Sequence, residues 1–182
     1  MTPSTVRDSA IELLAGWDAP DAGQDALRQA VLAFLYARTD ACERACVPGH
    51  ITASALVVAE SGDDVLLTLH PRLGRWVQLG GHCEPTDTDI VAAAMREATE
   101  ESGIDGLRVD AELGAIHVHA LTCSLGVPTR HLDLQFIARA PADAVIAISD
   151  ESLDLRWWPV DELPQGIDAA VAHLVAVGRS RS

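Results

Sequence analysis

Hydrophobic and polar positions along the chain follow two different periods, and the change falls at the Pro48-Gly49 pair. Before this pair, apolar residues recur at helical spacing, which predicts helices over residues 4–17 and 24–43 with a turn between them. After it, apolar residues come in short runs that are typical of strands. The pattern therefore predicts two parts: an N-terminal helical extension over residues 1–49 and a second domain over residues 50–182.

The second part of the chain carries the signals of a mixed sheet with one central and one terminal helix. Strand-like runs occupy residues 51–59, 65–69, 76–79, 109–125, 131–140 and 153–158, and helical patterns occupy residues 87–102 and 167–177. This order favours an α/β fold, here a mixed α+β sheet packed between helices as an α/β/α sandwich. The helices of the extension then remain to cover the sheet, form a homodimer contact or cap a substrate cleft.

Charge and composition narrow the class of partner. The chain has 182 residues, 48% of them hydrophobic, and a formal net charge of −14. A nucleic acid polymer is normally held by a basic face, so this charge argues against such a partner. A small phosphorylated ligand is compatible with it, because a divalent cation can bridge carboxylates to phosphate oxygens. We expect a cytoplasmic protein with no membrane partner, since the sequence contains no apolar run of transmembrane length and no signal-peptide pattern.

The cysteines give little support for a metal site. The chain has four of them, Cys42, Cys46, Cys83 and Cys123, and they form no C-x-x-C pair. Reduced, partly buried thiols are the favoured interpretation, with a zinc site as the less favoured alternative.

The strongest chemical signal is a group of three acidic residues on the predicted central helix. Glu97, Glu100 and Glu101 are spaced i, i+3 and i+4, which places their carboxylates on one face. Like charges at this spacing destabilise a bare helix by a few tenths of a kcal/mol per pair, roughly. A hard dication with oxygen ligands would remove that repulsion. The alternative is a solvated acidic face without a ligand.

Neighbouring residues favour the metal-binding interpretation. Arg96 can hold a carboxylate in one rotamer through a charge-assisted hydrogen bond. Gly80 and Gly81, upstream of the helix, allow the backbone to approach a ligand closely. Gly103 is placed to end the helix in a left-handed conformation. The opposite face of the helix is apolar and can pack on a sheet; it consists of Ile90, Val91, Ala94 and Ala98.

Residues 96–104, Arg-Glu-Ala-Thr-Glu-Glu-Ser-Gly-Ile, resemble the second half of the Nudix box, G-x(5)-E-x(7)-R-E-U-x-E-E-x-G-U, where U is aliphatic. The first half departs from this pattern. Counting forward from Gly81 puts Asp87 at the glutamate position, whereas counting back from Arg96 puts Thr88 there. The loop is thus one residue longer than the family pattern, and Glu84 and Asp87 are the available acids. We expect the acid in this loop to have a structural part, with Asp87 capping the start of the helix.

The resemblance covers about residues 51–164 and implies a Nudix fold. It also implies hydrolysis of the diphosphate bridge of a nucleoside diphosphate linked to another moiety, such as a nucleotide sugar, a dinucleotide or a nucleoside triphosphate. By position, Glu97, Glu100 and Glu101 would bind Mg²⁺ or Mn²⁺, and the Gly80 carbonyl would complete the set of ligands. Arg96 would orient the glutamates, and Glu97 or a later acid would accept a proton from water.

Residues outside the box are candidates for the substrate and for a further metal ligand. Arg130, His131 and Asp133 begin an otherwise apolar strand, so we expect them to contact substrate. Glu151 lies in a region where Nudix enzymes often place an extra metal ligand or base. Strand alternation sends His117 and His119 to one face, and hairpin pairing is expected to bring His131 near them; a functional role and ordinary polar lining of the sheet are both open. For Trp157 and Trp158, core or interface positions are favoured over base stacking.

Two other functions share the expected fold. An isopentenyl-diphosphate isomerase uses a cysteine beside a histidine, and the His82-Cys83 pair is faintly similar. A non-catalytic nucleotide-sensing module would tend to lack box glutamates. Glu97, Glu100 and Glu101 are all present here, so the hydrolase is the favoured function.

Overall fold

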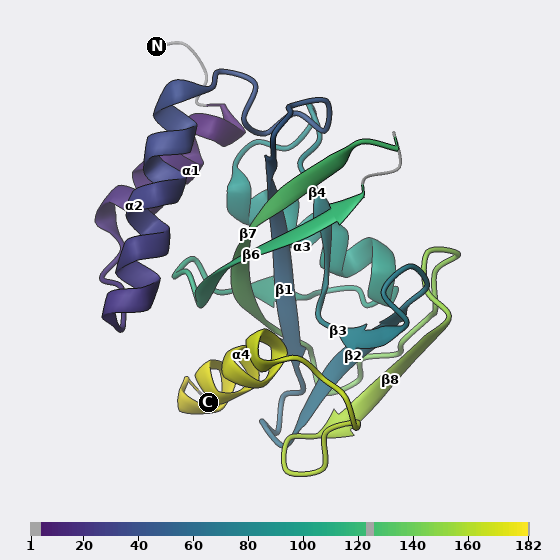
Figure 1. The fold of residues 1–182 in the computed structure, drawn as a ribbon. Coiled ribbons are helices and arrows are strands. Elements are labelled where there is room, and N and C mark those ends of the chain that lie inside the picture. The colour runs from purple at the N-terminus through teal and green to yellow at the C-terminus, as the bar shows by residue number, and fades with distance from the viewer. Residues whose placement is uncertain (1–4, 123–125, 182) are drawn as a thin grey trace.

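The computed structural model describes residues 5–122 and 126–181 and shows a curved mixed sheet packed between helices (Figure 1). The helices are α1 (Val6–Gly16), α2 (Ala22–Ala37), α3 (Ile90–Ser102) and α4 (Ala169–Ser180). The strands are β1 (His50–Val58), β2 (Asp64–His70), β3 (Arg75–Val77), β4 (Leu79–His82), β5 (Arg108–Val109), β6 (Ala115–Thr122), β7 (Pro128–Arg139) and β8 (Asp154–Pro159). The expected α/β class with a mixed sheet is confirmed.

Strand β1 is the centre of the sheet. It runs parallel to β7 along its whole length, from the pair His50↔His131 to the pair Val58↔Arg139. On its other side it pairs antiparallel with β4 along its first half and with β2 at its end. The remaining strands β3 and β8 pair with β2, and β5 and β6 pair with β7. The first half of β1 is therefore flanked by β4 and β7, so side chains from these three strands can meet.

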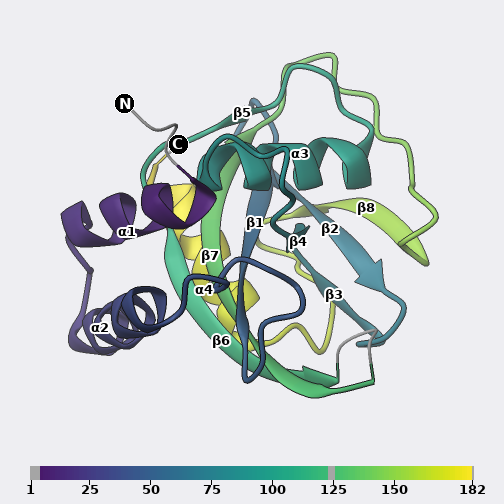
Figure 2. The ribbon, with the colours of Figure 1, turned by 90° about the horizontal axis from the view of Figure 1, so that it is seen from above.

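Helices cover both faces of the sheet, as Figure 2 shows for α3 and α4. Alternate residues of a strand point to opposite faces. In β1, Ile51, Ala53, Ala55 and Val57 join the core cluster that includes residues of α3, whereas Leu56 and Val58 join the cluster that includes residues of α4. The expected core or interface position of Trp157 and Trp158 is confirmed, because one packs against each cluster.

The N-terminal helices are joined to the sheet by both apolar and polar contacts. Leu14 is fully buried in the same core cluster as α3. The Trp17 indole N–H donates to the Leu113 carbonyl at 3.1 Å. The Gln24 amide makes two hydrogen bonds to Ile116, donating to its carbonyl at 3.1 Å and accepting from its N–H at 2.8 Å. Gln24 thus satisfies backbone groups on β6 in the way that a neighbouring strand would.

Several expected boundaries differ from the structure. The second helix ends at Ala37, and the guanidinium of Arg7 donates to the Leu35 carbonyl near that end, at 2.6 and 2.9 Å. The central helix begins at Ile90 rather than at residue 87. The expected long strand over 109–125 is two strands, β5 and β6, and its last three positions lie outside the described residues. None of the helices in the described part of the chain is long and apolar enough to cross a membrane.

Candidate active site

Helix α3 is fixed at both ends by caps. The carboxylate of Asp89, the residue before the helix, accepts a hydrogen bond from the Ala92 N–H at 2.8 Å. At the other end, Gly103 adopts the left-handed conformation with φ of 66°, which confirms the expected termination. The apolar face is buried as expected, most completely at Ile90, Ala94 and Ala98. These contacts set which face of α3 remains for the glutamates.

Arg96 holds the loop before the helix against the acidic face. Its Nε and Nη2 atoms donate to the two carboxylate oxygens of Asp87 at 2.9 and 3.1 Å, and Nη2 also donates to the His82 carbonyl at 2.9 Å. Its Nη1 atom donates to Glu97 at 3.1 Å and to Glu100 at 3.0 Å. One guanidinium therefore fixes the loop and two box glutamates in a single geometry.

Asp87 has a structural contact, but it is not the predicted one. The prediction that Asp87 caps the helix is wrong, because Asp89 occupies the cap position. Asp87 instead accepts a hydrogen bond from the Glu84 N–H at 2.7 Å and pairs with Arg96. The lengthened loop therefore separates two roles, since one acid closes the loop and a second acid caps the helix.

Two of the box glutamates lie against β4, the strand that contains Gly80 and Gly81. Glu101 is 8% exposed, and its Oε2 atom accepts a hydrogen bond from the Gly80 N–H at 2.9 Å. The Glu97 carboxylate lies against Gly81 so closely that a Cβ at that glycine would be 2.7 Å from Oε2. The side chain of Glu100 is 60% exposed and lies outermost. Because Gly80 and Gly81 carry no side chains, the carboxylates can approach the backbone of β4.

Burial makes negative charge costly at two of these positions. It raises the pKa of Glu97 to about 7, although Arg96 opposes the shift. Burial also raises the pKa of Glu101 to about 8, against the hydrogen bond from Gly80. The charge of Glu151 adds to both pKa shifts. The arrangement favours a bound cation, because a cation would stabilise the ionised carboxylates.

Asp133 lies at the centre of a buried polar network on the other face of β1. Its carboxylate accepts hydrogen bonds from the Thr52 hydroxyl at 2.9 Å and the Ser54 hydroxyl at 2.7 Å. It also accepts from the side-chain amides of Gln135 at 3.0 Å and Gln78 at 3.3 Å. Residues of β1 and β7 and the residue before β4 therefore share one carboxylate, which fixes the register at this face.

The remaining candidates on β7 do not all share one face. Strand alternation places His131 on the face of Asp133 and Arg130 on the opposite face, where Arg130 is exposed. The His131 ring packs edge-on against His119 with ring centroids 5.2 Å apart, and His117 stacks on His119 at 5.3 Å. The expectation that these three histidines lie close together is confirmed.

The sequence did not predict that two further histidines lie beside His131. His50, the first residue of β1, and His82, the last residue of β4, both lie beside His131. A usable signal was the alternation of His50, Thr52 and Ser54, three polar residues on one face of an otherwise apolar strand.

Comparisons with known proteins identify the family. Residues 48–176 match the NUDIX domain, so the chain belongs to the Nudix family, and the expected class of pyrophosphohydrolase is confirmed with it. A Nudix-family hydrolase from Clostridium perfringens has a similar structure, with a TM-score of 0.53, 23% identity, and 72% of this chain and 97% of that chain covered.

Two further solved structures show the same fold. A C. elegans Ap4A hydrolase binary complex has a TM-score of 0.50 and 20% identity, with 72% of this chain and 96% of that chain covered. A UDP-X diphosphatase has a TM-score of 0.55 and 16% identity, with 97% of this chain and 93% of that chain covered. The comparison with curated proteins finds no significant match.

Proposed function

We propose that this chain hydrolyses the diphosphate bridge of a nucleoside diphosphate linked to another moiety, such as a nucleotide sugar, a dinucleotide or a nucleoside triphosphate. Nudix hydrolases generally use divalent metals and act on small phosphorylated substrates. The observation that carries the proposal is the pair of carboxylates along the backbone of Gly80 and Gly81, one buried (Glu101) and one partly buried (Glu97). Among the described residues, Arg96 is the only guanidinium that bonds to the box glutamates. It also forms an ion pair with Asp87.

The donor set fits Mg²⁺ or Mn²⁺. The proposed ligands are all oxygens, which hard cations prefer: the carboxylates of Glu97, Glu100 and Glu101, and the Gly80 carbonyl. Glu151 is proposed as an additional ligand or base, because its charge acts on both Glu97 and Glu101. Two structures with this fold are named for Ap4A hydrolysis and for a UDP-X diphosphatase activity, so the fold is compatible with the reaction.

Different residues would orient the metal ligands and accept the proton during hydrolysis. A diphosphate bridge is inert because its negative charge repels a nucleophile, and a bound divalent cation would neutralise that charge and acidify water. Arg96 keeps Glu97 and Glu100 in one orientation, and Asp87 keeps Arg96 in place. Glu97 or a later acid is the proposed proton acceptor, because a carboxylate beside the metal can take a proton from the attacking water.

Substrate contacts are proposed for Arg130, His131 and Asp133. His131 and Asp133 lie on one face of β7, so they would act from inside the curved sheet. Asp133 already accepts four hydrogen bonds from neighbouring side chains, so its proposed part is to hold those side chains toward the substrate. Arg130 would act from the exposed face.

The domain division is also retained as a proposal. Residues 1–49 would form the helical extension and residues 50–182 the Nudix domain, which agrees with a family match that begins at residue 48. The contacts of Trp17 and Gln24 support a covering role for the extension, because both side chains bond to backbone of the second part. A homodimer contact through the exposed surface of the same helices remains part of the proposal.

The isomerase alternative is disfavoured by the position of Cys83. Its side chain packs against the hydrophobic core cluster, and its thiol points to the Ile51 carbonyl at 3.8 Å. The neighbouring thiol of Cys42 and burial raise the pKa of Cys83 far above its ordinary value. A thiol in such a place is a poor proton donor or acceptor. The sensor alternative is disfavoured because the second half of the box keeps all three of its glutamates, Glu97, Glu100 and Glu101.

The proposal is tested by metal removal. Purified protein should release nucleoside monophosphate or phosphate from at least one member of a panel of nucleotide sugars, dinucleotides, nucleoside triphosphates and coenzyme diphosphates. Release should stop in excess EDTA and return with Mg²⁺ or Mn²⁺, because the oxygen ligands suit these ions. Hydrolysis that persists in excess EDTA would contradict the metal role, and no release from the whole panel would contradict the reaction.

A further inference from the structure

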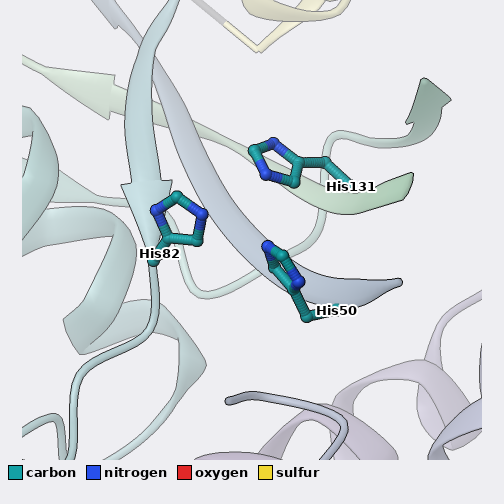
Figure 3. A group of neighbouring side chains, drawn as sticks. All are labelled: His50, His82 and His131. Carbon is teal, nitrogen blue, oxygen red and sulfur yellow. The ribbon is translucent and has the colours of Figure 1, made fainter. Parts of the chain in front are cut away.

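Three histidines from different strands meet on the face of the sheet opposite to α3. They are His50 on β1, His82 on β4 and His131 on β7, here called the histidine cluster (Figure 3). One ring nitrogen from each lies within 4.8 Å of the other two. The three pairs of ring centroids are 4.9 to 5.0 Å apart. Register brings them together, since His50 pairs with His131 and the partner of His82 is Thr52, two residues along β1.

Each member of the histidine cluster has a buried nitrogen without a protein partner. The Nε2 atoms of His50, His82 and His131 are all buried and make no hydrogen bond to the described residues. The Nδ1 atom of His50 lies 3.4 Å from the Cys46 carbonyl, which favours protonation at Nδ1 and leaves the Nε2 lone pair free. Three unpaired buried nitrogens in one place would be costly without a ligand that they share.

The imidazoles are suited to a metal rather than to an anion. Burial lowers the pKa of His82 to about 4 and lowers the pKa of His50, and the charge of Arg44 adds to both shifts. Burial likewise lowers the pKa of His131 to about 3. Neutral imidazoles offer lone pairs, whereas anion binding would need them protonated.

We propose that the histidine cluster is a binding site for a transition-metal dication, with Zn²⁺ as the first candidate. Imidazole nitrogens suit Zn²⁺ and its neighbours in the first transition row, whereas Mg²⁺ takes oxygen ligands. His119 is the nearest candidate for a fourth ligand, because its ring lies 5.2 Å from that of His131 and its Nδ1 atom is also buried and unpaired.

This site is separate from the glutamates of the box. Successive residues of a strand point to opposite faces. Glu97 lies against Gly81, whereas the next residue, His82, turns its ring to the histidine cluster. One hydrogen bond connects the two sites, because the His82 carbonyl accepts from Arg96 at 2.9 Å. A metal in the histidine cluster would tie β4 to β1 and β7, and so hold the strand on which the glutamates rest.

The test uses the full-length protein without a histidine tag, stripped of metal. The background variant Glu97→Gln/Glu101→Gln removes the two box carboxylates that lie against β4, so that metal binding on the other face of the sheet is measured alone. Equilibrium dialysis against Zn²⁺ in excess Mg²⁺ should leave one Zn²⁺ per chain, and Co²⁺ should give the visible bands of a nitrogen-ligated, low-coordinate ion. Ligand binding to the folded state should also raise the melting temperature.

Single variants then locate the ion. His82→Gln and His131→Gln, in the same background, should each weaken Zn²⁺ binding by about a hundredfold, because loss of a ligand costs at least as much affinity as loss of a residue that orients one. Both variants should also lose the Co²⁺ bands. His173→Gln is the matched control, since His173 is exposed on α4; it should bind as the background does. If both ligand variants fail to fold, the Co²⁺ spectrum of the background decides alone.

Several results would overturn the proposal. Failure of the background variant to bind Zn²⁺ would do so, as would Zn²⁺ binding that survives both His82→Gln and His131→Gln. Phosphate binding to metal-free protein that depends on these histidines would show an anion site instead. All of these outcomes are independent of the diphosphate reaction, because the background lacks the box carboxylates.

Discussion

At the scale of single residues, Glu101 is a buried carboxyl group that has no cationic side chain as a partner among the described residues. It is 8% exposed, and within the described residues its hydrogen-bond partner is the backbone N–H of Gly80. Its pKa of about 8 follows from that burial. A buried carboxyl group without a cationic partner does not stabilise the fold. We therefore infer that its role is to bind a cation.

Glu101→Gln therefore separates charge from shape. The amide oxygen can still accept from Gly80, so the fold should be kept, while the rate of hydrolysis should fall by about a hundredfold or more. Turnover at saturating Mg²⁺ and a thermal melt are the measurements. Glu162→Gln, the same change at an exposed position, serves as the control. A folded Glu101→Gln protein with near-normal turnover would show that this carboxylate is outside the reaction.

At the scale of elements, two nearby acids shape the start of α3 in different ways. Asp89 caps the helix through the Ala92 N–H, whereas Asp87, whose side chain is 4% exposed, forms a bidentate pair with Arg96. Asn can replace Asp at a cap but cannot offer two carboxylate oxygens to a guanidinium. The same substitution at the two positions should therefore have different results.

Asp87→Asn should lower the free energy of unfolding by about 1–3 kcal/mol, because a buried charge-assisted pair is broken. Asp89→Asn should have little effect, and Asp89→Ala should cost about 1 kcal/mol as a lost cap. Denaturant unfolding of the three variants gives these values. Turnover of Asp87→Asn should stay within a few-fold of normal. A large loss of rate with unchanged stability would place Asp87 in the metal site instead.

At the scale of the whole molecule, the extension and the sheet share one hydrophobic core. Leu14 and Leu35 of the N-terminal helices are fully buried in the cluster that includes Ala94 of α3 and Phe136 of β7. Elements that share a core are expected to unfold together. Leu14→Ala should therefore lower the stability of the entire chain by about 2–5 kcal/mol, in a single transition. A separate early transition, seen by calorimetry, would show that the extension unfolds alone.

The pH dependence of stability is a second property of the whole molecule. The folded-state pKa values of Glu97 and Glu101, about 7 and about 8, lie above the ordinary value of 4.5. The folded state then binds more protons, so the contribution of these groups is most favourable below the ordinary pKa and is lost as the pH rises through the raised values.

Metal-free protein should consequently lose melting temperature between about pH 5 and pH 8.5 relative to Glu97→Gln/Glu101→Gln. The comparison with this variant is needed because the lowered pKa values of His82 and His131 act in the opposite direction and cancel in the difference. Saturating Mg²⁺ should reduce the loss in the unmodified protein. Parallel pH curves for the two metal-free proteins would contradict the raised pKa values.

The sequence by itself determined what depends on local geometry. The spacing of Glu97, Glu100 and Glu101 places them on one face of any helix, and that helix follows from its own apolar period. Gly103 ends the helix for a reason that is also local, since glycine enters the left-handed region without a steric penalty. The family resemblance rests on these same positions, so it could be read without a structure.

The tertiary structure decided which distant residues meet. The pairing of Asp87 with Arg96 depends on how the loop folds back on the helix, and the contact of Gln24 with β6 depends on where the extension packs. The meeting of His50 with His131 depends on the register of two strands far apart in the chain. Register and packing are set by the simultaneous burial of many side chains, which no short stretch of sequence contains.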